Sequence, residues 1–224
     1  MSGLVTRRVI PSAVIALSTV TWPARGRAAL GRARGGRARL ELFFAFDDPC
    51  SAVAVPEIVV ACAARPVDVV LLPVVQRGIP GDPAVSDKRR EALVDARRRA
   101  RRASREILRA EPLAPGDTAF LARWAAAAPQ GPRLEAFCLR ALAALWFETA
   151  GPVLEADYAA IWRAELHGPP VSGEGAALRA EALMRRRGPY DVPAAVAGGR
   201  WFFAHDRPEQ VGDWLDELGW GVVA

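Results

Sequence analysis

The chain has 224 residues, of which 51% are hydrophobic and 25% are charged, and this composition excludes a disordered chain, a collagen and a small disulfide scaffold. The formal net charge of +5 suggests a nucleic-acid partner at first sight. However, residues 1–39 hold eight arginines and no acidic residue, which leaves 22 basic against 25 acidic residues over 40–224. The main body is therefore mildly acidic, and we do not expect it to bind nucleic acid.

Residues 1–39 are expected to form a basic, arginine-rich N-terminal extension. The apolar run at 9–21 is too short to span a bilayer, but with two arginines before it this run has a faint likeness to a signal peptide. Pro11 interrupts the run and six arginines follow it, which favours a surface arm or an amphipathic helix lying on the main domain. The arm has the charge to touch anionic lipid, although a solvated arm is the simpler interpretation.

The first regular elements predict a β-α-β unit. The apolar, aromatic run at 40–46 is typical of a buried strand, and the turn after it carries an aspartate that can cap a helix and a proline suited to the first helical position. A helix is expected over 50–64 and a second strand over 67–75. The near-continuous apolar sequence of this second strand is typical of a strand covered on both faces.

A block of helices follows. The first is predicted over 86–109, with Leu93, Ala96, Ala100 and Ile107 on its apolar face and a dense run of arginines opposite. Those arginines suit a solvated face, an anionic substrate or the acidic surface of a second subunit, and the sequence does not choose among them. Four more helices are expected at 119–128, 134–149, 153–166 and 176–187.

The last elements predict a β-hairpin and a helix. Short apolar runs at 193–197 and 200–204 flank a Gly-Gly pair, which is a hairpin signal. A closing helix is expected over 206–218, followed by a C-terminal tail at 219–224.

The order of these elements, β-α-β, helices, then β-β-α, predicts an α/β thioredoxin-like fold over 40–218. A helical subdomain is inserted at about 84–188, as in DsbA-type proteins.

Three cysteines, Cys50, Cys62 and Cys138, stand far apart in the chain. They form no Cys-x-x-Cys motif and no Cys/His quartet, so we expect no metal site. An odd, sparse set also argues against a disulfide-stapled secreted domain. We therefore expect a cytoplasmic location, with export as the alternative if residues 1–29 are a signal peptide.

Local sequence sharpens the fold prediction. The segment FFAFDDPCSAVA (43–54) resembles the strand-turn-helix of the 2-hydroxychromene-2-carboxylate isomerase and kappa-class glutathione transferase family. The segment at 190–215 is similar to the family's cis-proline strand and last helix. The segments at 112–118 and 137–148 also have counterparts, so the resemblance covers about residues 40–218.

The resemblance implies a glutathione site. Val192-Pro193 matches the family's cis-proline dipeptide, which exposes the backbone of the residue before proline to the cysteinyl part of glutathione. Asp206-Arg207 matches the pair at the start of the last helix, where the γ-glutamyl end is held. The resemblance therefore implies glutathione as a cofactor, a small-molecule substrate and a homodimer.

The chain departs from the family at Asp48, which stands where the family has its catalytic serine. An ionised aspartate has no proton to donate to a thiol sulfur and would repel a thiolate. Three interpretations remain open: Asp48 is a general base in a changed reaction, it stays protonated through burial, or it only caps the helix. Asp47 beside it would raise one pKa of the pair.

Two other residues of the turn are candidates for the chemistry. Ser51 is the hydroxyl left in the turn, and Cys50 is a thiol in the first turn of a helix, where the helix dipole lowers a thiol pKa and the two aspartates raise it. The turn lacks a paired cysteine, which argues against a thiol–disulfide oxidoreductase.

Two functions follow from these residues. The first is a DsbA-family isomerase or transferase that acts on a small organic, aromatic acid with glutathione or a similar thiol. The alternative is a catalytically degenerate thioredoxin-fold protein that binds a ligand or another protein.

Overall fold

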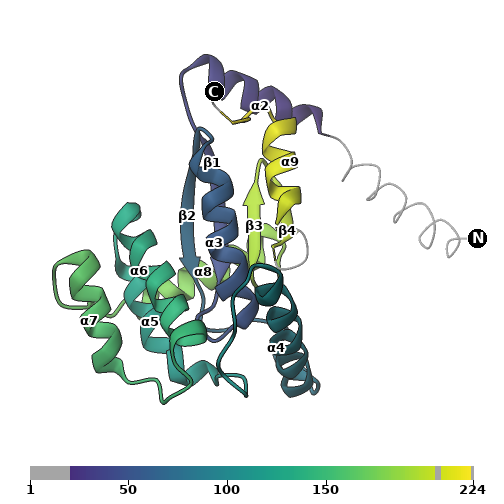
Figure 1. The fold of residues 1–224 in the computed structure, drawn as a ribbon. Coiled ribbons are helices and arrows are strands. Elements are labelled where there is room, and N and C mark those ends of the chain that lie inside the picture. The colour runs from purple at the N-terminus through teal and green to yellow at the C-terminus, as the bar shows by residue number, and fades with distance from the viewer. Residues whose placement is uncertain (1–20, 205–207, 223–224) are drawn as a thin grey trace, which may run out of the picture.

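The computed structural model describes residues 21–204 and 208–222. Most of the signal-like run at 9–21, together with Asp206 and Arg207, therefore lies outside the described residues. The described chain forms a four-stranded sheet flanked by helices, with a block of helices at one end (Figure 1).

The strands are β1 (Ala38–Phe44), β2 (Val67–Pro73), β3 (Ala194–Ala197) and β4 (Arg200–Phe203), in the sheet order β2-β1-β3-β4. β1 pairs in parallel with β2 and antiparallel with β3, and β3 pairs antiparallel with β4. Gly198 and Gly199 form the tight turn between the last two strands, both with positive φ, as the Gly-Gly signal predicted.

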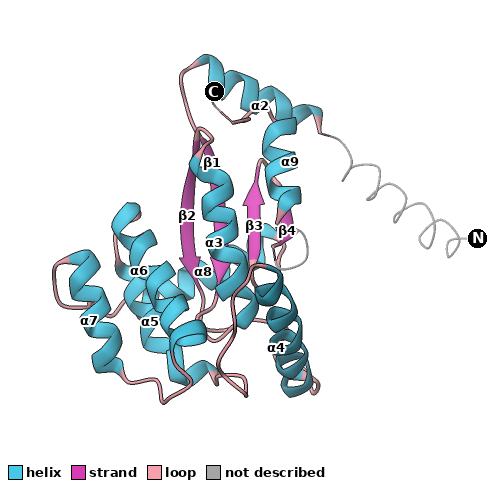
Figure 2. Ribbon diagram, viewed as in Figure 1, coloured by secondary structure: helices cyan, strands magenta, loops and turns pink. Residues whose placement is uncertain are grey.

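Helices cover the two faces of the sheet because side chains alternate along β1. Leu40, Leu42 and Phe44 belong to the main core, to which α3 (Pro49–Ala63) and α9 (Glu209–Glu217) contribute. Phe43 points to the opposite face and packs in a second cluster with Met184 of α8 (Glu174–Arg187). The strand-helix arrangement is drawn in Figure 2. The predicted thioredoxin-like architecture is therefore confirmed.

Five α-helices and a short π-helix stand between β2 and β3 in the chain. Their bounds are α4 Val85–Arg102, α5 Pro115–Ala127, α6 Pro132–Ala143, the π-helix η1 Ala144–Glu148, α7 Glu155–Leu166 and α8 Glu174–Arg187. In Figure 1, α5, α6 and α7 gather on one side of the molecule and α4 lies on the other.

The helix predicted over 86–109 is too long. α4 ends at Arg102, and Ser104 adopts a positive φ of 55°, which breaks the helix. The chain beyond runs irregularly and buries Arg109, whose guanidinium donates to the carbonyls of Leu145 and Gly151 at 2.6 and 2.9 Å. The conformation of the chain after Arg102 is therefore determined by tertiary hydrogen bonds rather than by helical periodicity.

Part of the N-terminal extension is a helix, α2 (Trp22–Ala33), that packs against the domain. Ala24 and Ala28 are buried in the main core. Arg25 forms an ion pair with Glu217, and Arg32 donates to the carbonyl of Leu218. Residues 22–33 therefore lie as a helix on the main domain, at the end of the molecule where α9 also lies (Figure 1).

The start of the predicted C-terminal tail packs as well. Trp220 is buried, and the guanidinium of Arg32 lies 5.4 Å from the centre of its ring.

Within residues 21–204 and 208–222, none of the helices combines the length and hydrophobicity needed to cross a membrane.

Candidate functional site

The candidate site begins at the turn between β1 and α3. Asp48 is the N-cap of α3, and its Oδ2 accepts hydrogen bonds from the Ser51 amide at 2.8 Å and the Ser51 hydroxyl at 2.6 Å. The Ser51 hydroxyl in turn accepts from the Ala45 amide at 3.3 Å. Both side chains are fully buried. These contacts of Asp48 are those of a helix cap, and the Ser51 hydroxyl makes its hydrogen bonds within the same turn.

A buried arginine joins three carboxylates at this turn. Nη1 of Arg77, just beyond β2, lies 3.5 Å from Oδ1 of Asp48 and 3.7 Å from Oδ1 of Asp191. Nε of Arg77 lies 3.7 Å from Oδ2 of Asp47, which is also 3.7 Å from Arg89 of α4. These distances are those of ion pairs without close hydrogen bonds. We call these five residues the charge cluster.

The charge cluster is sealed from water over part of its surface. Oδ2 of Asp47 and both Nε and Nη2 of Arg77 are buried and have no hydrogen-bond partner in the described part of the chain. Burying charged groups in this state costs free energy, which a purely structural turn would not need. A cluster of this kind is more typical of a functional site than of a scaffold.

The pKa directions within the charge cluster follow from burial and proximity. Burial raises the pKa of Asp47, and the charge of Asp48 adds to this, while Arg77 and Arg89 act in the opposite direction. Burial acts to lower the pKa of Arg77, but the nearby carboxylates, with Asp48 first, outweigh it and raise the pKa. Arg77 is thus a permanent cation, and Asp47 is easier to protonate than an ordinary aspartate.

Arg77 is held in place by distant parts of the chain. The Oε1 of Glu181, on α8, accepts from the amides of Val75 at 3.0 Å and Gln76 at 2.9 Å. The Gly78 amide donates to the carbonyl of Tyr190 at 3.0 Å, and Gly78 has a positive φ. These contacts tie the segment after β2 to α8 and to the loop before β3.

The turn itself is fixed from the helical block. The indole Nε1 of Trp146 donates to the carbonyl of Phe46 at 3.0 Å. Trp146 is fully buried and lies in the π-helix η1, an element that often occurs at functional sites. The inserted helices therefore hold the end of β1 directly before Asp47.

A pocket with a volume of about 400 Å³ opens at the charge cluster. Its apolar wall includes the rings of Tyr190 and Phe203, which pack edge to face at 5.4 Å. Its charged lining residues are Asp48, Arg77, Asp82, Lys88, Arg89, Glu91, Asp95 and Asp191. Mixed charge beside aromatic rings suits a small organic ligand with a polar end.

Cys50 lines this pocket, but its thiol is not activated. Burial raises the pKa of Cys50, with Asp48 as the next cause, and its Sγ lies 3.4 Å from the carbonyl of Ala92 as a donor. The two effects opposing the helix dipole therefore dominate. Cys62 and Cys138 lie in the core, where burial raises both pKa values, that of Cys62 to about 11.

The Val192–Pro193 peptide bond is cis, as the resemblance implied. Val192 lines the pocket, but its backbone N–H donates to Oδ1 of Asp191 at 2.9 Å. The amide assigned to glutathione is thus engaged within the protein. Asp206 and Arg207, the other two residues of the predicted glutathione site, lie outside the described residues.

The described residues do not fit a glutathione thiolate. The Ser51 hydroxyl donates to Asp48, the Val192 amide donates to Asp191, and the carboxylate of Asp48 occupies the position assigned to the donor. A thiolate here would meet negative charge and engaged donors. We therefore derive no step through glutathione.

Of the predicted site residues, Asp48, Cys50 and Val192 line one pocket, Ser51 is hydrogen-bonded to Asp48, and Pro193 follows Val192 through the cis peptide bond. The sequence reasoning missed Arg77, Arg89 and Asp191, which complete the charge cluster. A weak signal existed for Asp191 as the neighbour of Val192, and for Arg77 as a charge directly after a buried strand. The role of Arg89 could not be predicted, because nothing in the sequence distinguishes it from the solvated arginines of the same run in α4.

Comparison with known proteins adds one relationship. No family model matches the sequence, and no curated protein matches it. Among solved structures, the chain is similar to 2-hydroxychromene-2-carboxylate isomerase, with a TM-score of 0.61 and 15% sequence identity over 81% of this chain and 96% of that chain. The likeness shows that the chain shares the DsbA-like fold of that isomerase.

Proposed function

We propose that the protein is an isomerase that moves a proton within a small aromatic organic acid, and that it does so without a thiol. The observation that carries this proposal is the charge cluster at the pocket, in which Asp48 and Arg77 line the cavity and Asp47 lies behind them. The fold it shares with 2-hydroxychromene-2-carboxylate isomerase supports the reaction class.

The geometry assigns a role to each group. Oδ2 of Asp48 is held by Ser51, so Oδ1, beside Arg77, is the atom that handles the proton. For 2-hydroxychromene-2-carboxylate it takes the proton of the 2-hydroxyl as the ring C–O bond breaks, and it returns this proton to the phenolate oxygen that the bond releases. The guanidinium of Arg77 stabilises the negative charge that develops on the substrate in between. The proton is returned, so the reaction needs no co-reactant.

The rest of the pocket supports binding of an aromatic acid. Tyr190 and Phe203 offer ring surfaces to an aromatic substrate, and Arg89 is a cation at the wall that can pair with its carboxylate.

The experiment is a spectrophotometric isomerisation assay with 2-hydroxychromene-2-carboxylate, run with and without glutathione. We expect turnover without glutathione and a loss of about two orders of magnitude or more in kcat for Asp48→Asn. Asparagine caps a helix as well as aspartate does, so this variant removes the charge while keeping the fold. The control is Asp68→Asn, an exposed aspartate on β2, which we expect to leave kcat unchanged.

A second candidate function is ligand binding without turnover. It is favoured by the use of both Oδ2 of Asp48 and the Ser51 hydroxyl in capping, and by the excess of carboxylates in the pocket lining. In that case calorimetry would detect binding of the aromatic acid, and the isomerisation assay would detect no product. Conversion that strictly requires glutathione would contradict both candidates.

A further inference from the structure

A second pocket lies in the inserted helical block. It has a volume of about 570 Å³ and shares no lining residue with the pocket at the charge cluster. Its walls are the end of α5, the loop from α5 to α6, the start of α6, the end of α7 and the segment after α7. The volume is in the range of sites that hold a drug-sized ligand.

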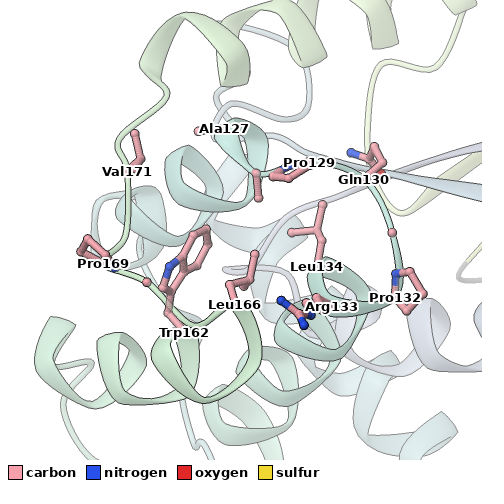
Figure 3. A pocket seen from close by; sticks show the side chains of 13 residues that line it. Ala127, Pro129, Gln130, Pro132, Arg133, Leu134, Trp162, Leu166, Pro169 and Val171 are labelled. Atoms are coloured by element: carbon pink, nitrogen blue, oxygen red, sulfur yellow. The ribbon is translucent and has the colours of Figure 1, made fainter.

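The walls of this second pocket are apolar. Trp162 and Leu166 extend into it from α7, Leu134 from α6, and Pro169 and Val171 from the segment beyond (Figure 3). Leu134 and Trp162 are buried, so the inner wall belongs to the protein core.

The inner wall is also rigid. The ring of Trp162 packs edge to face on Phe137 at 4.8 Å and on Trp124 at 5.9 Å. A wall held in this way is formed before any ligand arrives, which lowers the cost of binding.

Two hydrogen-bond donors of this pocket lack partners in the described part of the chain. Arg133, the one charged residue of the described lining, has no ion pair or hydrogen bond there, and it lies beside Leu134 and Leu166 (Figure 3). The indole N–H of Trp162 has no acceptor among the described residues either. Its nitrogen is not one of the described side-chain atoms that are fully buried without a hydrogen-bond partner. A buried tryptophan N–H normally has a partner, so a ligand or a water molecule can satisfy this donor.

We propose that this second pocket binds an apolar carboxylic acid, of which a medium-chain fatty acid is the simplest form. The carboxylate pairs with the guanidinium of Arg133, and the chain lies along Leu134, Leu166 and Trp162. The described lining holds no carboxylate, so a cationic ligand finds no counter-charge there. This site is independent of the proposed isomerase function.

The test is isothermal titration calorimetry of the full-length protein with decanoate, below its micelle-forming concentration, and with 1-decanol as the uncharged probe of equal chain length. We expect decanoate to bind more tightly than decanol. Arg133→Gln should weaken decanoate binding by about tenfold and leave decanol unaffected. Arg140→Gln is the matched control, because Arg140 is an exposed arginine on α6 that does not line the pocket.

A second pair of variants makes the result independent of Arg133. Val171 lines the pocket and is 62% exposed, so its substitution leaves the core intact. Val171→Asp should weaken decanoate binding by about threefold more than Val171→Asn does, because it adds a negative charge to the lining of the pocket that holds the carboxylate. Equal binding of decanoate and decanol, or equal affinities in the paired variants, would overturn the proposal.

Discussion

Asp48 shows how one side chain can both cap a helix and take part in a cluster of charges. Its side chain caps α3 through Oδ2, a role that the sequence Asp-Pro before a helix predicts. Its Oδ1 belongs to the charge cluster, and this could not be predicted, because Arg77 and Asp191 come from segments 29 and 143 residues further along the chain. A capping hydrogen bond can be predicted from neighbouring residues in the sequence, whereas the partners of an ion pair depend on the tertiary fold.

The Asp48→Ser variant tests whether the carboxylate excludes a thiol. Serine still caps a helix, and its hydroxyl can donate to a sulfur, so we expect measurable glutathione binding by calorimetry where the unmodified protein shows little. The control is Asp48→Asn, which removes the charge without restoring a hydroxyl. An unchanged glutathione affinity in Asp48→Ser would show that repulsion by Asp48 is not what keeps the thiol out.

Asp47 gives the protein a pH-dependent stability. Because burial raises the pKa of Asp47 in the folded state, its contribution is fully present below the pKa of an unfolded aspartate and is lost as pH rises through the raised value. Asp47→Asn, which stays neutral, should therefore gain stability relative to the unmodified protein as pH rises through this window. Urea unfolding across that pH range measures it, and a stability difference independent of pH would contradict the assigned burial effect.

Among the helices and strands, the ends of elements were the part hardest to predict. The strands, α3 and the hairpin lie within a few residues of the predicted ranges, because alternation, capping and the Gly-Gly pair are local signals. The helix predicted over 86–109 stopped early because Arg109 is drawn into hydrogen bonds with the segment after α6. The helix predicted over 134–149 changes to a π-helix at Ala144 for which no local signal was visible.

The docking of α2 on the domain makes a prediction at this scale. Ala28 is buried against the core and its neighbour Ala29 is exposed on the same helix. Ala28→Asp should lower the free energy of unfolding by about 2 kcal/mol, which corresponds to a fall in Tm of about 4–8 °C, because it buries a charge. Ala29→Asp should have little effect. Calorimetric melting curves that are equal for the two variants would show that α2 is not docked.

At the scale of the whole molecule, the inserted helices contribute to two separate sites. α4 supplies one wall of the pocket at the charge cluster, and α5, α6 and α7 surround the apolar pocket of Figure 3. The sequence predicted the insertion and the position of the turn between β1 and α3, since both depend on the order of elements. It predicted neither pocket wall, because each is assembled from helices whose packing the periodicity leaves open.

The net charge of the whole chain and the charge at the candidate site come from different parts of the molecule. The +5 of the whole chain comes from the N-terminal extension, part of which is α2, packed at the end of the molecule where α9 lies (Figure 1). The charge that matters for the proposed reaction is the charge cluster of three aspartates and two arginines at the turn, of which Asp47 and Asp48 are buried. Overall charge is therefore a poor guide to the ligand of this protein.

The most direct test of the central claim, proton transfer by Asp48 without a thiol, is to compare the rate at which the protein isomerises 2-hydroxychromene-2-carboxylate in H₂O and in D₂O without glutathione. We predict that the unmodified protein converts the substrate in the absence of glutathione and does so more slowly in D₂O than in H₂O, because the transferred proton moves between oxygen atoms, and that Asp48→Asn loses this turnover. Equal rates in the two solvents, turnover that persists in Asp48→Asn, or turnover that starts only when glutathione is added would contradict the account.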